Sequence, residues 1–202
     1  MDRRTFCLGS AAAAVCCHAE GVFAATGTGA TGAATASRSP AIALDEIVFD
    51  SRYAECRSFA AAARRSGHQT IAFEGDVTPL WHDMLRPLWA AGRGSVAGMT
   101  TPSSLFCLEQ MAKDHWRHVV IRIDHRRSLI GFSHRVTATE PMLSRTFAAL
   151  NRRQDWPERV MELLGSCERA KDRPCSSGPV SDDLLDPSVA SGADLVSWVI
   201  SA

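Results

Sequence analysis

Four polar residues follow short apolar runs of the sequence, at the points where buried strands are expected to end: Asp50, Asp76, Thr101 and His125. Carboxylates and imidazoles perform general acid–base catalysis, and ligands of open parallel sheets bind where the carboxyl ends of the strands meet. We therefore take Asp50, Asp76 and His125 as candidate catalytic residues, with His125 and Asp124 or Asp50 as a candidate acid–base pair. The structural alternative is that the two acids cap helices or form turns, as Asp commonly does at such junctions.

A second candidate site lies where Thr101-Pro102-Ser103-Ser104 precedes a helical run. Thr is a favoured N-cap residue, and Pro is a favoured first residue of a helix. The free backbone N–H groups and the dipole of a helix start also attract anions. Thr101, Ser103 and Ser104 are thus candidate anion-binding residues, with plain helix capping as the alternative.

The spacing of apolar residues predicts the elements that position these side chains. Apolar residues at three- and four-residue spacing indicate helices, and short β-branched or aromatic runs indicate strands. Strands are predicted at 46–50, 69–73, 95–99 and 119–124, with helices at 52–66, from 78 to a kink or break at Pro87, and at 101–115. Crossovers of this length predict an α/β fold, an open three-layer sheet whose first four strands are parallel in the order βαβαβαβ.

Ser51 can cap the first helix and Gly67 can end it, and Thr78 is the expected cap of the second. In the fourth strand, Arg122 and Asp124 share a face, and a structural pair between them is expected.

The pattern changes after Arg127, where a C-terminal hairpin and helical extension begins. A turn at 125–128 and a strand at 129–136 predict a hairpin in which His125 and His134 face each other. Helices are predicted at 140–152 and after a cap at Asp155, followed by a polar loop at 167–191 and a final strand at 195–200 that returns to the sheet.

The N-terminal residues have the pattern of an export signal. Arg3 and Arg4 precede Phe6 and an uncharged, Ala-rich run from Gly9 to Cys17, and a short cationic start before an apolar stretch is typical of such signals. Arg3, Arg4 and Phe6 resemble the twin-arginine (Tat) signal, although Asp2, Cys7 and Leu8 depart from its usual pattern. The resemblance covers the signal only.

The Tat resemblance implies a partner, a location and a domain division. The partner is the Tat translocase, which exports proteins that have already folded, and the location is the bacterial periplasm. Residues 1–36 would then be the signal and tether, with cleavage after Ala24 or Ala36, and residues 37–202 would form a single α/β domain.

Four of the seven cysteines lie beyond this signal. Cys56 and Cys107 fall in apolar helical patterns and are predicted to be small buried side chains. Cys167 and Cys175 flank a short polar loop, and in an oxidising compartment they either form a disulfide or remain reduced.

The composition limits the partners. The chain has 22 basic and 22 acidic residues and no basic block, which argues against nucleic acid or an anionic membrane as the main partner. Beyond the signal, no apolar run approaches the ~20 residues of a membrane-spanning helix. The pairs His115/His118 and His125/His134 have no nearby Cys or third spaced ligand, so no metal site is predicted. The sequence identifies no cofactor, and four of the five Trp residues lie in periodic apolar segments that predict packing.

Two functions from different classes follow from these observations. The favoured one is a non-catalytic accessory or binding protein for another periplasmic component, because the Tat route exports cofactor-loaded redox enzymes and the subunits that accompany them. The alternative is a small hydrolase-like enzyme at the carboxyl edge of the sheet, using Asp50, Asp76, Thr101 and His125.

The export prediction is tested by replacing both arginines. The double change Arg3→Lys and Arg4→Lys should abolish export, because the resemblance depends on that pair. Cell fractionation measures this. Recovery of the double variant in the periplasm at the level of the unchanged protein would contradict the Tat assignment.

Overall fold

The computed structural model describes residues 42–128, 131–138, 155–166, 176–179 and 194–202, together with Thr146 and Leu150 in helical conformation. All of these residues belong to one unit, Ser37–Ala202. Among them, no helix is long and apolar enough to cross a bilayer.

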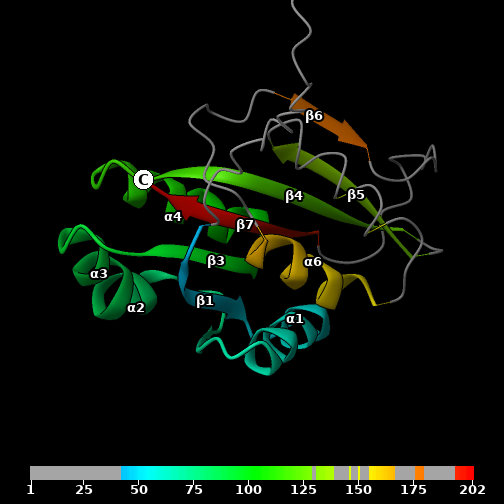
Figure 1. The fold of residues 1–202 in the computed structure, drawn as a ribbon, viewed down its shortest axis with the longest axis horizontal. Coiled ribbons are helices and arrows are strands. Elements are labelled where there is room, and N and C mark those ends of the chain that lie inside the picture. Colours follow the sequence, from blue (N-terminus) through cyan, green and yellow to red (C-terminus); the bar gives the residue numbers. More distant parts are fainter. Residues whose placement is uncertain are drawn as a thin grey trace, which may run out of the picture. The chain divides into compact units, whose positions relative to one another are not determined.

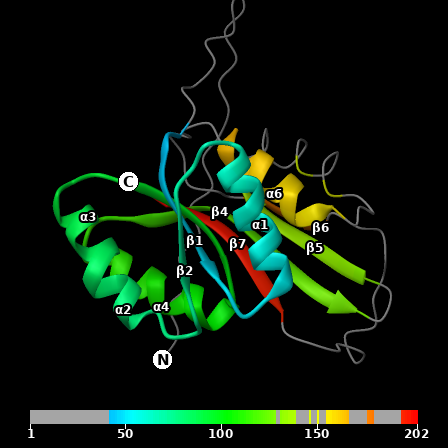
Figure 2. The ribbon, with the colours of Figure 1, turned by 90° about the horizontal axis from the view of Figure 1, so that it is seen from below.

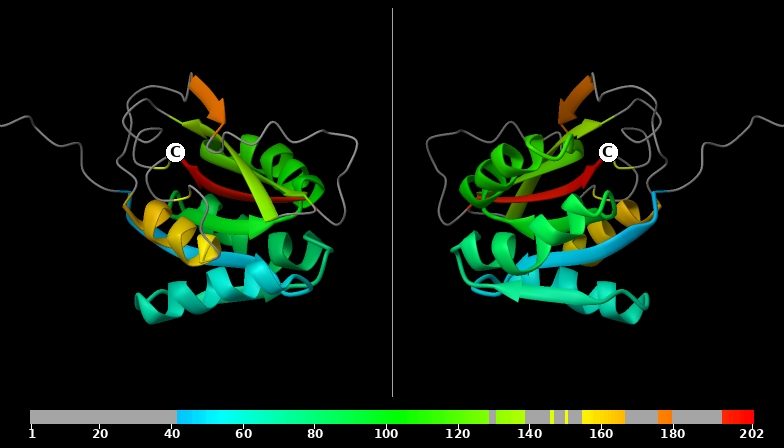
Figure 3. Two further views of the ribbon diagram at one scale, coloured as in Figure 1. Left: turned by 90° about the vertical axis from the view of Figure 1, so that its right-hand side faces the viewer. Right: turned by 90° about the vertical axis from the view of Figure 1, so that its left-hand side faces the viewer.

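The described chain forms a mixed sheet with helices on both faces (Figures 1 and 3). The strands are β1 (Leu44–Asp50), β2 (Thr70–Phe73), β3 (Ser95–Thr100), β4 (His118–Ser128), β5 (Gly131–Ala138), β6 (Ser176–Pro179) and β7 (Leu195–Ser201). The helices are α1 (Ala54–Arg65), α2 (Thr78–Leu80), the π-helical η1 (Trp81–Leu85), α3 (Arg86–Ala90), α4 (Pro102–Lys113) and α6 (Trp156–Gly165).

The strand order is β2-β1-β3-β7-β4-β5-β6. The predicted parallel pairing is confirmed for β2-β1-β3 and wrong for β4. The final strand β7 lies between β3 and β4 and is antiparallel to both, as the red arrow in Figure 1 shows. Since β3 and β4 are each antiparallel to β7, β4 still runs in the direction of β1, β2 and β3.

Each face of the sheet buries its own apolar core. Helices α1 and α6 lie side by side on one face (Figure 2) and cover side chains such as Phe49, Met99 and Ile123. Helix α4 and the α2–η1–α3 segment cover the other face, which includes Val48, Val196 and Trp198. Because successive side chains of a strand point to opposite faces, neighbouring positions of one strand belong to different cores.

Pro87 does not break the second helix. The π-helical segment η1 directly precedes α3, and the Arg86 N–H donates to the carbonyl of Trp81, five residues earlier. This wider turn makes room near the proline, whose ring would crowd the carbonyl four residues before it in a regular α-helix. The predicted irregularity therefore takes the form of a π-helical turn.

Two predicted caps differ in the structure. Ser51 does not cap α1, whose N-cap is Tyr53; its hydroxyl donates instead to the Phe73 carbonyl at 3.3 Å. Asp155 is the N-cap residue of α6, but it makes no capping bond there and pairs with Arg159. Gly67 ends α1 as predicted, with φ of +85°.

Further differences lie in the second half of the chain. Strand β4 extends to Ser128 and pairs with Gly131 of β5, so the predicted turn at 125–128 is wrong and His125 lies within a strand. Strand β6 lies inside the predicted loop 167–191. The predicted helix 140–152 falls outside the described residues except at Thr146 and Leu150.

Gly98 is the tightest point of the sheet. A Cβ at this residue would lie 2.5 Å from Cζ2 of Trp198 and 2.9 Å from Cγ2 of Val48. The Gly98→Ala change should therefore reduce the free energy of unfolding by about 1–3 kcal/mol through overpacking, as measured by denaturant titration. Gly165→Ala is the control, because its Cβ would meet only Cε of Met161 at 3.9 Å. Equal stability of the two variants would refute this account of the packing.

Candidate functional site

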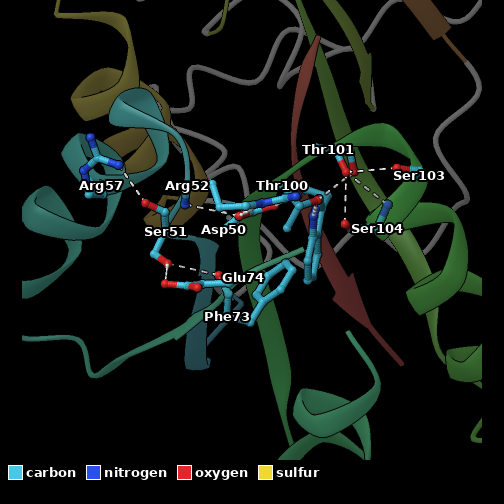
Figure 4. A network of polar contacts seen from close by, with 11 residues as sticks. Asp50, Ser51, Arg52, Arg57, Phe73, Glu74, Thr100, Thr101, Ser103 and Ser104 are labelled. Atoms are coloured by element: carbon cyan, nitrogen blue, oxygen red, sulfur yellow. Dashed lines mark hydrogen bonds and ion pairs between the residues drawn. The ribbon is translucent and has the colours of Figure 1, made fainter. Parts of the chain in front are cut away.

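The strand order reverses direction between β1 and β3. The chain passes from β1 through α1 to β2 on one side, and from β3 through α4 toward β4 on the other. In open α/β sheets, ligands bind in the crevice outside the strand ends at such a switch point. Phe49 is level with Met99, so the next residues, Asp50 and Thr100, end neighbouring strands at this point (Figure 4).

Asp50 is fully buried and paired within the chain. Nε and Nη2 of Arg52 donate to its two carboxylate oxygens at 2.9 Å and 2.6 Å, while the Arg52 side chain remains 47% exposed. The hydrogen bond to this carboxylate raises the pKa of Arg52. Gly75, at φ +76°, leaves space for the guanidinium, since a Cβ there would lie 2.6 Å from Cζ. Both Asp50 oxygens are thus engaged by a residue two positions away.

The start of α4 is capped as predicted. Thr101 Oγ1 accepts a hydrogen bond from the Ser104 N–H at 3.3 Å and lies 3.0 Å and 2.9 Å from the hydroxyls of Ser103 and Ser104. Figure 4 shows the three side chains turned toward one another. The three candidate anion-binding residues are therefore together, and their hydroxyls form a capping cluster.

Asp76 has a helix-start role. Its Oδ1 accepts a hydrogen bond from the Thr78 N–H at 2.8 Å, and this bond lowers the pKa of Asp76. The α2–η1–α3 segment begins at Thr78, so Asp76, rather than the predicted Thr78, satisfies its first free donor. Asp76 therefore has the capping role that we gave as the structural alternative to catalysis.

His125 lies on the opposite face of the sheet from Asp50. Its imidazole stacks on Trp156 of α6, with ring centroids 4.3 Å apart, whereas Asp50 shares the face of Val48, which packs in the other core. Strands β3 and β7 also separate β1 from β4, a gap of about 14 Å at the usual strand spacing. Asp50 and His125 thus reach the same end of the sheet without forming one site.

Neighbouring Asp124 is likewise engaged, on the opposite face from His125. Nη2 of Arg122 donates to Oδ1 of Asp124 at 2.8 Å, which confirms the predicted structural pair, and both side chains are about one-third exposed. The proposed acid–base pairing of His125 with Asp124 or Asp50 is therefore absent from the described contacts.

His125 and His134 face each other across the hairpin, as predicted. Their Nδ1 atoms are 2.7 Å apart, and Nε2 of His125 lies 2.7 Å from Oγ of Ser197 on β7. Burial and the neighbouring His134 lower the pKa of His125 well below its usual value, and burial lowers the pKa of His134 to about 4. The pair is neutral near pH 7, with one Nδ1 donating and the other accepting.

One functional candidate was missed at the sequence level. Trp116 follows α4, is 90% exposed and has a φ of +57°, the only positive value outside glycine in the described chain. The Trp116 N–H donates to Lys113, and the Arg117 N–H donates to Ala112. These bonds form a type of helix end at which glycine is the usual residue. In the sequence, the lack of a glycine after the helical run is the feature that could have indicated Trp116.

Trp116 adjoins the exposed face of α4. Phe106 is 61% exposed, and Cys107 is exposed, contrary to the prediction that it is buried. The reason is that Leu105, Leu108 and Ala112 supply the buried stripe, which turns position 107 outward. The other exposed residues of α4 are Ser103, Gln110 and Lys113, and Trp116 lies beyond Lys113, the last helical residue.

The remaining predictions and the comparisons add no further site. Arg3, Arg4, Phe6, Cys167 and Cys175 lie outside the described residues, whereas Cys56 is buried as predicted. Within the described ranges, no group of three or more His, Cys, Asp or Glu side chains could hold a metal ion. No protein-family model, curated protein or solved structure matches this chain.

The histidine pair predicts loss of stability in acid. In the unfolded chain, an imidazole has a pKa of about 6.5. Below this pH, the unfolded state therefore binds protons that the buried pair does not accept. The contribution of the pair to the free energy of unfolding should be fully present above pH 6.5. It should fall as the pH decreases toward 4, by about 1.4 kcal/mol per pH unit for each histidine. Denaturant titrations at several pH values measure this slope.

The variants His134→Phe and Phe132→Leu separate titration from packing. His134→Phe removes one imidazole and should reduce the slope by about half. Phe132→Leu alters the same cluster, since Phe132 stacks on Trp156 at 5.0 Å, but it keeps both imidazoles and the full slope. An unchanged slope in His134→Phe would contradict the assignment.

Proposed function

We propose that this protein is an exported accessory or binding protein that acts by contact with another protein of the periplasm. The location is the one that the Tat resemblance implies, and a redox enzyme is the kind of component that this route exports. The observation on which the proposal depends is the exposure of Trp116. This large apolar side chain is 90% exposed, and its backbone has the left-handed conformation, which is unfavourable for residues other than glycine.

The cost of this arrangement supports a binding role. A left-handed conformation costs a non-glycine residue roughly 1–2 kcal/mol, and glycine would end the helix without that cost. An indole that is exposed to solvent makes few packing contacts, so these contacts offset little of the conformational cost. Residues that break a local structural rule without a structural gain are expected at functional positions, and aromatic side chains dominate the energetics of protein interfaces.

The candidate catalytic groups support the same proposal. Asp50 is paired with Arg52, Asp76 caps a helix start, Thr101 caps α4, and His125 is buried against Trp156. Each group thus has a structural role in its present contacts.

The alternative function is hydrolase-like activity at the switch point. The observation that favours it is the position of Asp50 beside Thr100, where the strand order reverses. Such an enzyme would need Asp50 to exchange Arg52 for a substrate. Hydrolysis of simple esters or phosphoesters that Asp50→Asn abolishes and Trp116→Gly leaves intact would support this alternative.

Photocrosslinking in cells tests the binding function. A benzoylphenylalanine placed at position 116 should give a discrete crosslinked product, because it would lie against the partner. The matched control is position 65, an exposed site at the end of α1, which should give none. If position 116 yields no more product than position 65, the proposed function is wrong.

A further inference from the structure

The buried histidine pair connects three strands to the start of helix α6. His125 of β4 and His134 of β5 lie opposite each other in the strand register, and Nε2 of His125 lies 2.7 Å from Oγ of Ser197 on β7. The ring of Trp156, the first residue of α6, contacts both imidazoles, with centroids 4.3 Å from that of His125 and 5.1 Å from that of His134. A change in the charge of the pair therefore acts on these strands and on α6 together.

The contact between the two imidazoles can accept one proton without breaking. The facing Nδ1 atoms are 2.7 Å apart, so one of them carries the hydrogen and the other accepts it. After one proton is added, His125 can donate from Nδ1 to His134 and from Nε2 to the hydroxyl of Ser197, because a protonated imidazole has two donors and a hydroxyl oxygen accepts. The singly protonated pair therefore keeps its hydrogen bonds.

A second proton breaks this contact. Both Nδ1 atoms then carry hydrogens, neither can accept, and two positive charges face each other at a buried site. The strands hold the two residues opposite each other, since β4 and β5 are paired from Arg122 to Ser128, so one ring must turn. His134 is the ring that can turn, because it is 5% exposed whereas His125 is fully buried. Turning His134 removes its ring from Trp156.

The start of α6 depends on this contact. Its N-cap residue, Asp155, makes no capping hydrogen bond, so the free donors of the first turn give it no side-chain anchor there. Trp156 is nevertheless 4% exposed, and the rings that it contacts are those of His125, His134 and Phe132. Loss of the histidine contact therefore weakens the attachment of this turn to the sheet.

The charged side chains around the pair do not neutralise a doubly protonated form. On this face of the sheet, Arg127 of β4 pairs with Glu55 of α1, and the β7 residues Leu195, Ser197 and Val199 are uncharged. The remaining charged residues of β4, β5 and α6 near the pair point to the other sheet face, pair with one another or lie on another side of α6: Asp124, Arg126, Arg135, Asp155, Arg159, Glu162 and Glu158. Burial lowers the pKa of both histidines, and His134 lowers that of His125 further.

We propose that the histidine pair is an acid-sensitive switch, in which a second proton separates the two imidazoles and releases the first turn of α6 from the β4–β5 hairpin. The core on the other face of the sheet contains no residue of α6, so it stays folded when this turn is released. Release uncovers the apolar surface between Trp156 and Phe132. The inference does not depend on Trp116 or on the proposed function.

The indole N–H signals of Trp156 and Trp198 test the switch in ¹H–¹⁵N NMR spectra of the full chain, recorded from about pH 7 to 4. In the open form both imidazoles have their ordinary pKa of about 6.5. The ratio of open to closed form should therefore increase by up to about a hundredfold for each pH unit below this value. The Trp156 signal should change steeply, while the Trp198 signal stays in place, because its N–H is buried and bonded to Thr100.

The variants His134→Gln and Phe132→Leu separate protonation from packing. Glutamine can still form a hydrogen bond with His125 but binds no proton, so the ratio of open to closed form should increase by at most about tenfold per pH unit. Phe132→Leu is the matched control, because Phe132 contacts the same Trp156 ring at 5.0 Å and the variant keeps both imidazoles and the steep response. If His134→Gln fails to fold, His134→Phe gives the same comparison.

Three results would overturn the switch. The first is a Trp156 signal that changes only together with that of Trp198, because acid would then unfold the whole domain. The second is a Trp156 signal that stays unchanged down to pH 4, and the third is an equally steep response in the unchanged protein and in His134→Gln. None of these results bears on the proposed function, which crosslinking at position 116 tests separately.

Discussion

The contact of Trp198 with Gly98 and Thr100 holds the two halves of the sheet together. Trp198 is fully buried on β7, its ring occupies the space that a side chain at Gly98 would fill, and its Nε1–H donates to Oγ1 of Thr100 at 3.1 Å. Strand β7 joins the parallel strands β2-β1-β3 to the β4-β5 hairpin. The last strand of the chain thus completes the centre of the sheet, and both long edges beside it would be unpaired without it.

The same arrangement determines what the carboxyl edge can do. Inserting β7 moves β4, and His125 with it, away from Asp50 and Thr100, and the polar groups that remain at the switch point bond to one another. Asp50 is held by Arg52, and Thr101 is held by the start of α4. The edge is consequently stabilised by its own side chains, while the exposed aromatic groups lie along α4 and at its far end.

Local patterns in the sequence were sufficient for most elements and for several contacts. The β-branched runs located β1 and β7, Thr101 and Gly67 marked helix ends, and the spacing of His125 and His134 predicted their contact. The position of β7 was not predictable, because an apolar strand fits a parallel or an antiparallel neighbour equally well. His125 was placed in a turn because the apolar run ends at Asp124, although alternating burial continues through Arg126. Trp116 was not predicted as a functional residue, because its exposure and its positive φ depend on the backbone geometry at the end of α4, which the sequence pattern does not determine.

The central claim is that Trp116 is exposed in order to contact another protein while Trp198 serves the fold, and the indole N–H signals of the five Trp residues test it in one measurement. In ¹H–¹⁵N NMR spectra recorded before and after the addition of unlabelled periplasmic proteins, the Trp116 signal should shift. The Trp198 signal should stay fixed, because its N–H is buried and bonded to Thr100. A Trp116 signal that does not change on this addition, or one that changes no more than that of Trp198, would contradict the account.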